Sequence, residues 1–142
     1  MDLQIAEKLA KEKIMEHCPG FAFKFGKTKN RLGYCSYRNK TIELSKSYVE
    51  LNPEQSIMDT IMHEIAHAKV GPGNGHNKTW KDMARKLGAN PCSTTEAITP
   101  KKTVIGECVN CGTKWERYNL PKRSYHHDAC GLEKGRVIWK RI

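Results

Sequence analysis

The stretch "LNPEQSIMDTIMHEIAHAKVGPGNGH", residues 51–76, decides how the rest of the chain is interpreted. Its apolar residues recur every three or four positions, which predicts an amphipathic helix with one buried face. Asn52 is expected to cap this helix, with Pro53 at its first position and Gln55 as a capping-box partner. The run of glycine and proline at 71–75 then ends the helix, because neither residue type continues one.

Two histidines and a glutamate lie within one turn of this helix. His63 and His67 are four positions apart, so their side chains project from the same face and can reach one zinc ion. Glu64 is rotated by about 100° from His63, which places its carboxylate beside the ion, where it can take a proton from an attacking water. The pattern therefore predicts a zinc hydrolase in which Glu64 is the general base.

Zinc catalysis needs a third protein ligand and an open position. His76 is the candidate, because the glycine-rich run before it can reverse the chain and return its imidazole to the helix. A distant glutamate in place of His76 is an alternative. Two other interpretations are exposed histidines that flank a glutamate by chance, and a structural zinc site. Structural sites are closed and usually rich in cysteine, so three histidines favour catalysis.

A second candidate zinc site lies near the C-terminus. Cys108 and Cys111 form a Cys-x-x-Cys pair, and His127 and Cys130 repeat the same spacing. Together they predict a structural Cys₃His zinc site, with His126 as the alternative to His127. The alternative is that these thiols and histidines are unrelated to one another. A redox pair is a further interpretation of Cys-x-x-Cys, but no thioredoxin-like βαβ pattern surrounds it. Metal binding would supply folding energy to a segment that has few large apolar residues.

The segments around these motifs predict an α+β protein of two domains, residues 1–100 and 101–142. We expect a helix over 1–17, a small antiparallel meander of three strands within 21–45, and a further helix within 76–88. Residues 101–142 are expected to form short strands joined by turns.

Composition narrows the class of protein. The chain has 142 residues, 38% of them hydrophobic, and no apolar run approaches the roughly 20 residues that span a bilayer. The N-terminal segment lacks the apolar core of a signal peptide. We therefore expect an intracellular protein of the cytoplasm, nucleoid or nucleus, not a secreted or membrane protein. Its six cysteines are then more readily free or metal-bound than paired in disulfides.

The formal net charge of +10 favours a polyanionic partner. Residues 101–142 hold ten Lys or Arg against four Asp or Glu, interleaved with four aromatic residues. Cations with aromatics suit phosphate contact plus base stacking, which favours single-stranded DNA. A basic pI that only keeps the protein soluble is the plainer interpretation. The candidate nucleic-acid contacts are Lys114, Arg117, Lys122, Arg123, Lys134, Arg136, Lys140 and Arg141. Two of the aromatic residues, Trp115 and Trp139, can alternatively form the small core of this module.

The run "IMDTIMHEIAHAKVGPGNGHNKTWKDMARKLGANP" resembles the SprT-like (Spartan) metalloproteases, and "RLGYCSYRNKTIELS" is similar to the strand pair that precedes the zinc helix in that family. The resemblance implies a zincin-like minimal metalloprotease domain, with helices packed on a small antiparallel sheet, followed by a zinc ribbon. It implies that His63, His67 and His76 hold the catalytic zinc and that Glu64 is the base. Family ribbons usually present four cysteines, so His127 is a departure.

The resemblance also implies a function, namely proteolysis of DNA-bound proteins as in the repair of DNA–protein crosslinks. DNA and DNA-bound proteins are then the expected partners, of a protein expected to be a monomer. Two alternatives stay open at this point. One is a zinc-containing DNA-binding module without protease activity, and the other is a metallopeptidase whose substrates are unrelated to DNA.

Overall fold

The structure is a computed structural model that describes residues 1–92 and 97–142. The chain divides into two compact units, Met1–Pro100 and Lys101–Ile142, and each is described by itself. None of the helices in the described residues has the length and apolar character that a bilayer-spanning segment requires.

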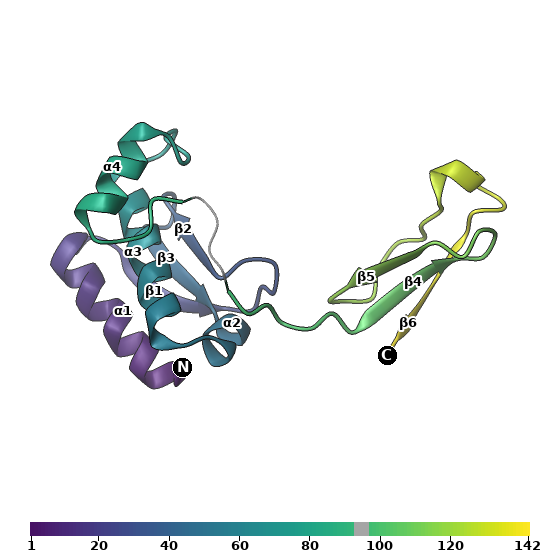
Figure 1. Cartoon of the computed structure of the whole chain (residues 1–142), viewed down its shortest axis with the longest axis horizontal. Coiled ribbons are helices and arrows are strands. Elements are labelled where there is room, and N and C mark those ends of the chain that lie inside the picture. The colour runs from purple at the N-terminus through teal and green to yellow at the C-terminus, as the bar shows by residue number, and fades with distance from the viewer. Residues whose placement is uncertain (93–96) are drawn as a thin grey trace. The chain divides into compact units, whose positions relative to one another are not determined.

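The described residues of the first unit form four helices and three strands, which confirms the expected α+β class (Figure 1). Helix α1 begins where the Asp2 side chain accepts a hydrogen bond from the Ile5 amide, a regular N-cap. The elements in chain order are α1 (Leu3–His17), β1 (Ala22–Gly26), β2 (Gly33–Ser36), β3 (Thr41–Ser45), α2 (Lys46–Leu51), α3 (Glu54–Val70) and α4 (Lys78–Lys86).

The three-stranded sheet has the order β1-β3-β2, with β3 in the centre (Figure 1). β2 and β3 are antiparallel, but β1 pairs with β3 in parallel, so the expected antiparallel meander is wrong for this pair. The reason lies in the connection between β1 and β2. A meander needs only a short turn here, but the connection spans residues 27–32 and is long enough to pass one strand position. Ser45 holds this connection: its amide donates to Leu32 O at 2.7 Å and its hydroxyl to Thr28 O at 2.6 Å.

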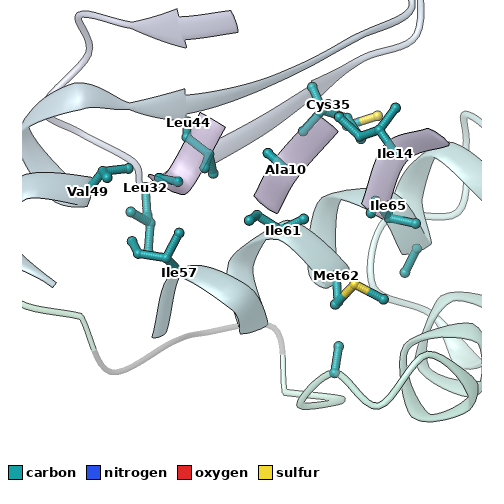
Figure 2. Packing of buried hydrophobic residues seen from close by; sticks show 14 of the residues in the cluster. Ala10, Ile14, Leu32, Cys35, Leu44, Val49, Ile57, Ile61, Met62 and Ile65 are labelled. Carbon is teal, nitrogen blue, oxygen red and sulfur yellow. The ribbon is translucent and has the colours of Figure 1, made fainter. Parts of the chain in front are cut away.

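The core of this unit lies between α1, α3 and one face of the sheet. Ile57, Ile61 and Ile65 form the fully buried stripe of α3, as its apolar periodicity predicts. Figure 2 shows these side chains gathered with Ala10 of α1 and Leu44 of β3. Because β2 is an edge strand packed on α3, its inward-facing residues lie beside the histidines and the glutamate of that helix.

The start of α3 differs from the expected capping. Pro53 occupies the N-cap position and makes no side-chain cap, whereas Asn52 ends the short helix α2. The side-chain Nδ2 of Asn52 donates to Tyr48 O at 2.8 Å and to Ile98 O at 2.9 Å. The side-chain Oδ1 accepts from the backbone amide of Ile98 at 2.8 Å. The buried side chain therefore joins α2 to residues after α4 instead of capping α3.

The second unit is a three-stranded antiparallel sheet with the order β5-β4-β6. Gly106 of β4 lies between Trp115 of β5 and Trp139 of β6, and a Cβ at Gly106 would meet the Trp139 ring at 2.6 Å. The glycine therefore lets the indole lie flat on the sheet. The elements are β4 (Val104–Cys108), β5 (Lys114–Arg117), the 3₁₀ turn Asp128–Cys130 and β6 (Val137–Arg141).

Candidate metal centres

Three imidazoles converge at the C-terminal half of α3. His76 Nε2 lies 3.1 Å from His63 Nε2 and 3.2 Å from His67 Nε2. Ligand nitrogens bound to one tetrahedral zinc at 2.0–2.1 Å lie about 3.3–3.4 Å apart. The three nitrogens therefore fit one zinc ion and leave a fourth coordination position free of these side chains.

The electrostatics of the group favour metal binding. Burial, followed by the charge of the neighbouring imidazoles, lowers the pKa of both His63 and His67 to about 4. Both rings are therefore neutral at pH 7, and neutral imidazole is the form that binds a metal.

His76 reaches this group because the loop after α3 is built to turn back. Gly71 and Gly73 adopt positive φ angles of 83° and 87°, which only glycine adopts readily. Asn74 donates to the carbonyls of Val70 at 3.0 Å and of Gly71 at 3.1 Å, which satisfies the end of the helix. These contacts hold the loop in the conformation that returns His76 to α3.

The Trp80 ring packs against all three imidazoles. Its ring is fully buried, with its centroid 4.6 Å from those of His63 and His76 and 5.2 Å from that of His67. Its Nε1 donates to His63 O at 3.4 Å. The apolar periodicity of residues 76–88 predicts that Trp80 is buried. It does not predict that the Trp80 ring packs against the three imidazoles.

Glu64 is buried in the same cleft as the three histidines. Its Oε1 lies 4.0 Å from His63 Nε2, within the reach of a water that occupies the fourth position. Burial raises the pKa of Glu64 to about 8, against the opposing effect of the Arg31 charge. The positive charge of a bound Zn²⁺ ion would oppose this effect of burial and favour the ionised carboxylate, which is the form that accepts a proton.

The opposite wall of the cleft comes from β2 and the residues after it. The cleft has a volume of about 350 Å³ and is lined by the histidines, Glu64, Gly33, Tyr34, Cys35 and Tyr37. The sequence pattern of the β2 segment predicts only a strand. The three lining residues of β2 and the following Tyr37 were not predicted, because strand periodicity gives the faces of β2 but not the helix against which it packs.

The second unit also brings its predicted ligands together. Cys108, Cys111, His127 and Cys130 place their ligand atoms within 4.8 Å of one another. His127 Nδ1 lies 3.2 Å from Cys111 Sγ and 3.5 Å from Cys130 Sγ, close to the roughly 3.6 Å expected for nitrogen and sulfur on one tetrahedral zinc. The four side chains therefore fit a closed, structural zinc site.

His126 is not part of this group, so the geometry favours His127 over the alternative ligand. The His126 Nε2 lies 3.0 Å from Asp128 Oδ1, away from the thiols. Each half of the site ends in a glycine of positive φ, Gly112 at 77° and Gly131 at 86°. These glycines close the two tight turns that present the ligands.

A second cavity lies on the aromatic side of this small sheet. Its volume is about 480 Å³, and Trp115, Tyr125 and Trp139 line it together with Arg117. Both tryptophans are half-buried, so they pack on the sheet and also face the cavity. The Arg117 Cζ lies 5.9 Å from the Trp139 ring centroid, and all eight cations proposed for nucleic-acid contact are exposed.

The fold and the histidine cluster together have the features of a small zinc metallopeptidase domain. A sequence model of the SprT-like family matches residues 3–102, so the chain belongs to the SprT-like family. This confirms the resemblance drawn from the motifs.

Among solved structures, the chain is similar to the metallopeptidase zymogen of Methanocaldococcus jannaschii, jannalysin. The similarity covers 57% of this chain and 79% of that one, with 22% sequence identity and a TM-score of 0.50. No curated protein matches the chain in a comparison of sequences. Membership of the family and the shared fold support a zinc metallopeptidase.

Proposed function

We propose that this protein is a zinc-dependent endopeptidase that cleaves proteins bound to DNA. The observation that carries the proposal is the convergence of His63, His67 and His76 with the Glu64 carboxylate in one cleft. Three neutral imidazoles leave one metal position for water or substrate, which is the arrangement of a catalytic and not a structural site.

The chemistry follows from the positions of these residues. Zinc, when bound, supplies Lewis-acid polarisation of the scissile carbonyl and of the attacking water. Glu64 Oε1 accepts the proton of that water and passes it to the leaving amine. Trp80 and the loop after α3 hold the imidazoles in place, and the β2 wall of the cleft is available to position the peptide.

The second unit supports DNA as the location of the substrate. Its exposed cations can contact phosphates, and the cavity lined by Trp115, Tyr125 and Trp139 has aromatic faces on which an unpaired base can stack. We therefore propose that the ribbon, with zinc held by Cys108, Cys111, His127 and Cys130, binds single-stranded DNA. Selection of the substrate would then come from location on DNA.

The test compares the wild type with Glu64→Gln, using Glu54→Gln at the exposed start of α3 as the matched control. The substrate is a protein covalently linked to a single-stranded oligonucleotide, and zinc is measured in the same samples. We expect two zinc equivalents in all three proteins. Cleavage should fall by about 10²–10⁴-fold in Glu64→Gln only, the range for loss of a general base.

The possible failures are distinct. Wild-type cleavage rates in Glu64→Gln would refute the assignment of the base. Cleavage that is equal with and without DNA, and insensitive to salt, would refute the DNA-bound substrate and indicate a metallopeptidase with other targets. Binding of DNA without any cleavage by the zinc-loaded wild type would indicate a DNA-binding module.

A further inference from the structure

The positive charge of the first unit is concentrated in one segment. Residues 24–46 contain seven Lys or Arg and a single acidic residue, Glu43, whereas the remainder of residues 1–100 contains eight Lys or Arg and ten Asp or Glu. This segment runs from the middle of β1 through β2 and β3 to Lys46, the first residue of α2, so the cationic excess of the unit belongs to its sheet and the residue that directly follows it.

Four of these cations meet at one end of the sheet, where β1 and β3 end and β2 begins. We call Lys27, Lys29, Arg31 and Lys46 the sheet-end cluster. Lys27, Arg31 and Lys46 are exposed and Lys29 is half-buried. Among the residues that the structure describes, none of the four takes part in an ion pair, whereas Lys24 on the same sheet lies 3.9 Å from Glu43.

The backbone that carries the cluster is held firmly. Ser45 bonds to the carbonyls of Thr28 and Leu32, which brackets the connection between β1 and β2, and the Asn30 amide donates to Thr28 Oγ1 at 3.3 Å. Lys46 directly follows Ser45. Three of the cations are therefore carried by a fixed loop and the fourth, Lys46, by the start of α2 next to it, which lowers the entropic cost of binding an anion.

The cluster lies next to the catalytic cleft. The Arg31 guanidinium stacks 4.0 Å from the centroid of the Tyr34 ring, and Tyr34 lines the cleft. A polyanion bound to these cations would run past the mouth of the cleft.

We propose that the sheet-end cluster is a second nucleic-acid site, which binds the phosphates of single-stranded DNA beside the cleft independently of the ribbon. Cations that form no ion pair within the described residues, on a fixed loop and the helix start beside it, have the features that phosphate binding requires. The inference rests on the proposed function, since it takes DNA as the partner, and it assigns to the protease unit the task of holding the strand at the point of cleavage.

The test uses the full chain in the Glu64→Gln background, so that protease activity does not enter the measurement. The variant Lys27→Gln/Lys29→Gln/Lys46→Gln is compared with Lys8→Gln/Lys11→Gln/Lys13→Gln. The second variant removes the same charge from α1 of the same unit, where glutamates lie among the lysines. Binding of a labelled single-stranded oligonucleotide is measured across a salt series, and circular dichroism and zinc content verify folding.

Each single-strand phosphate contact contributes about 0.7 to the slope of log affinity against log salt. Removal of three contacts should lower that slope by about 2 and weaken binding by roughly 100-fold in 0.1 M salt, with little change in the α1 variant. Photo-cross-linking to an oligonucleotide that contains iodouracil should label the peptide that includes residues 27–34.

Unchanged affinity and slope in the sheet-end variant would overturn the inference, and so would an equal loss in both variants, which would reflect net charge alone. Cross-links confined to residues 101–142 would also overturn it. If the parent chain itself does not bind the oligonucleotide, then the DNA component of the proposed function fails as well. The parent measurement therefore separates the two failures.

Discussion

Gly33 permits the close approach between the edge strand β2 and the proposed general base. A Cβ at this position would lie 2.8 Å from Thr60 Cγ2 and 3.1 Å from both Cγ and Oε1 of Glu64. Ordinary contacts between carbon atoms are about 3.5–4.0 Å. In Gly33→Ala, either the strand or the Glu64 side chain must therefore move by about half an ångström to one ångström.

We expect Gly33→Ala to lose about 100-fold in kcat/KM, because a displacement of about 1 Å in a catalytic group has an effect of that size. The loss corresponds to about 2.7 kcal/mol of transition-state stabilisation. The nearest atoms to the added methyl group belong to Thr60 and Glu64 and to none of the histidines, so zinc content should be unchanged. Overpacking should also lower the free energy of unfolding by about 1–3 kcal/mol.

A second substitution separates the two effects. Thr60→Ser removes the methyl group that the new Cβ would meet first, and it keeps the hydroxyl that donates to Ser56 O at 2.9 Å. Gly33→Ala/Thr60→Ser should therefore recover stability but not activity, since the contact with Glu64 remains. Gly20→Ala is the control, because its added Cβ would meet no atom within 4 Å. The assay is the initial rate of cleavage of the DNA-linked protein, with thermal unfolding in parallel. Wild-type kcat/KM in a folded, zinc-loaded Gly33→Ala protein would refute this role of the β2 approach.

Three further predictions follow from the metal centres and the core. His127→Ala should lose one zinc equivalent, and the near-UV circular dichroism signal of the ordered tryptophans in the ribbon should disappear. His126→Ala should keep both the zinc and the signal. Equal zinc loss in the two variants would contradict the geometry. Trp80→Ala should lower the free energy of unfolding by about 3–5 kcal/mol and weaken zinc binding, because it removes the buried ring that packs against the histidines. Denaturant titration measures the first effect and zinc competition the second. Burial raises the pKa of Cys35 to about 12 from 9.0, so the thiol of the unfolded chain loses its proton at a lower pH than the thiol of the folded protein. The free energy of unfolding should therefore fall above pH 9, by at most about 1.4 kcal/mol per pH unit. Cys35→Ala should lose less stability than the wild type as the pH rises above 9. The prediction fails if the difference in the free energy of unfolding between the two proteins is the same from pH 8 to pH 11.

The grouping of the three histidines was predictable from the sequence because it rests on local spacing. The four-residue separation of His63 and His67 fixes their common face on any helix, and the glycine-rich run indicates a reversal before His76. The family resemblance, now confirmed by the match over residues 3–102, gave the zincin-like α+β class.

The arrangement of the strands was not predictable in the same way. Apolar alternation identifies a strand and its faces, but it does not say which strand lies next to which, and β1 was placed beside β2 instead of β3. Asn52 was misassigned for a related reason. Its hydrogen bonds go to Ile98, 46 residues away, and local capping rules do not include such partners.

The error in strand order bears directly on the site. With β3 in the centre, β2 becomes the edge strand, and the residue that begins it, Gly33, packs on Glu64. The connection that passes β3 must then cross the end of the sheet. It carries Lys27, Lys29 and Arg31, and Arg31 stacks on Tyr34 in the wall of the cleft. A meander with β2 in the centre would bury that edge and leave the cations on a tight turn. The parallel pairing of β1 and β3 therefore gives the cleft its wall and brings the sheet-end cluster beside it.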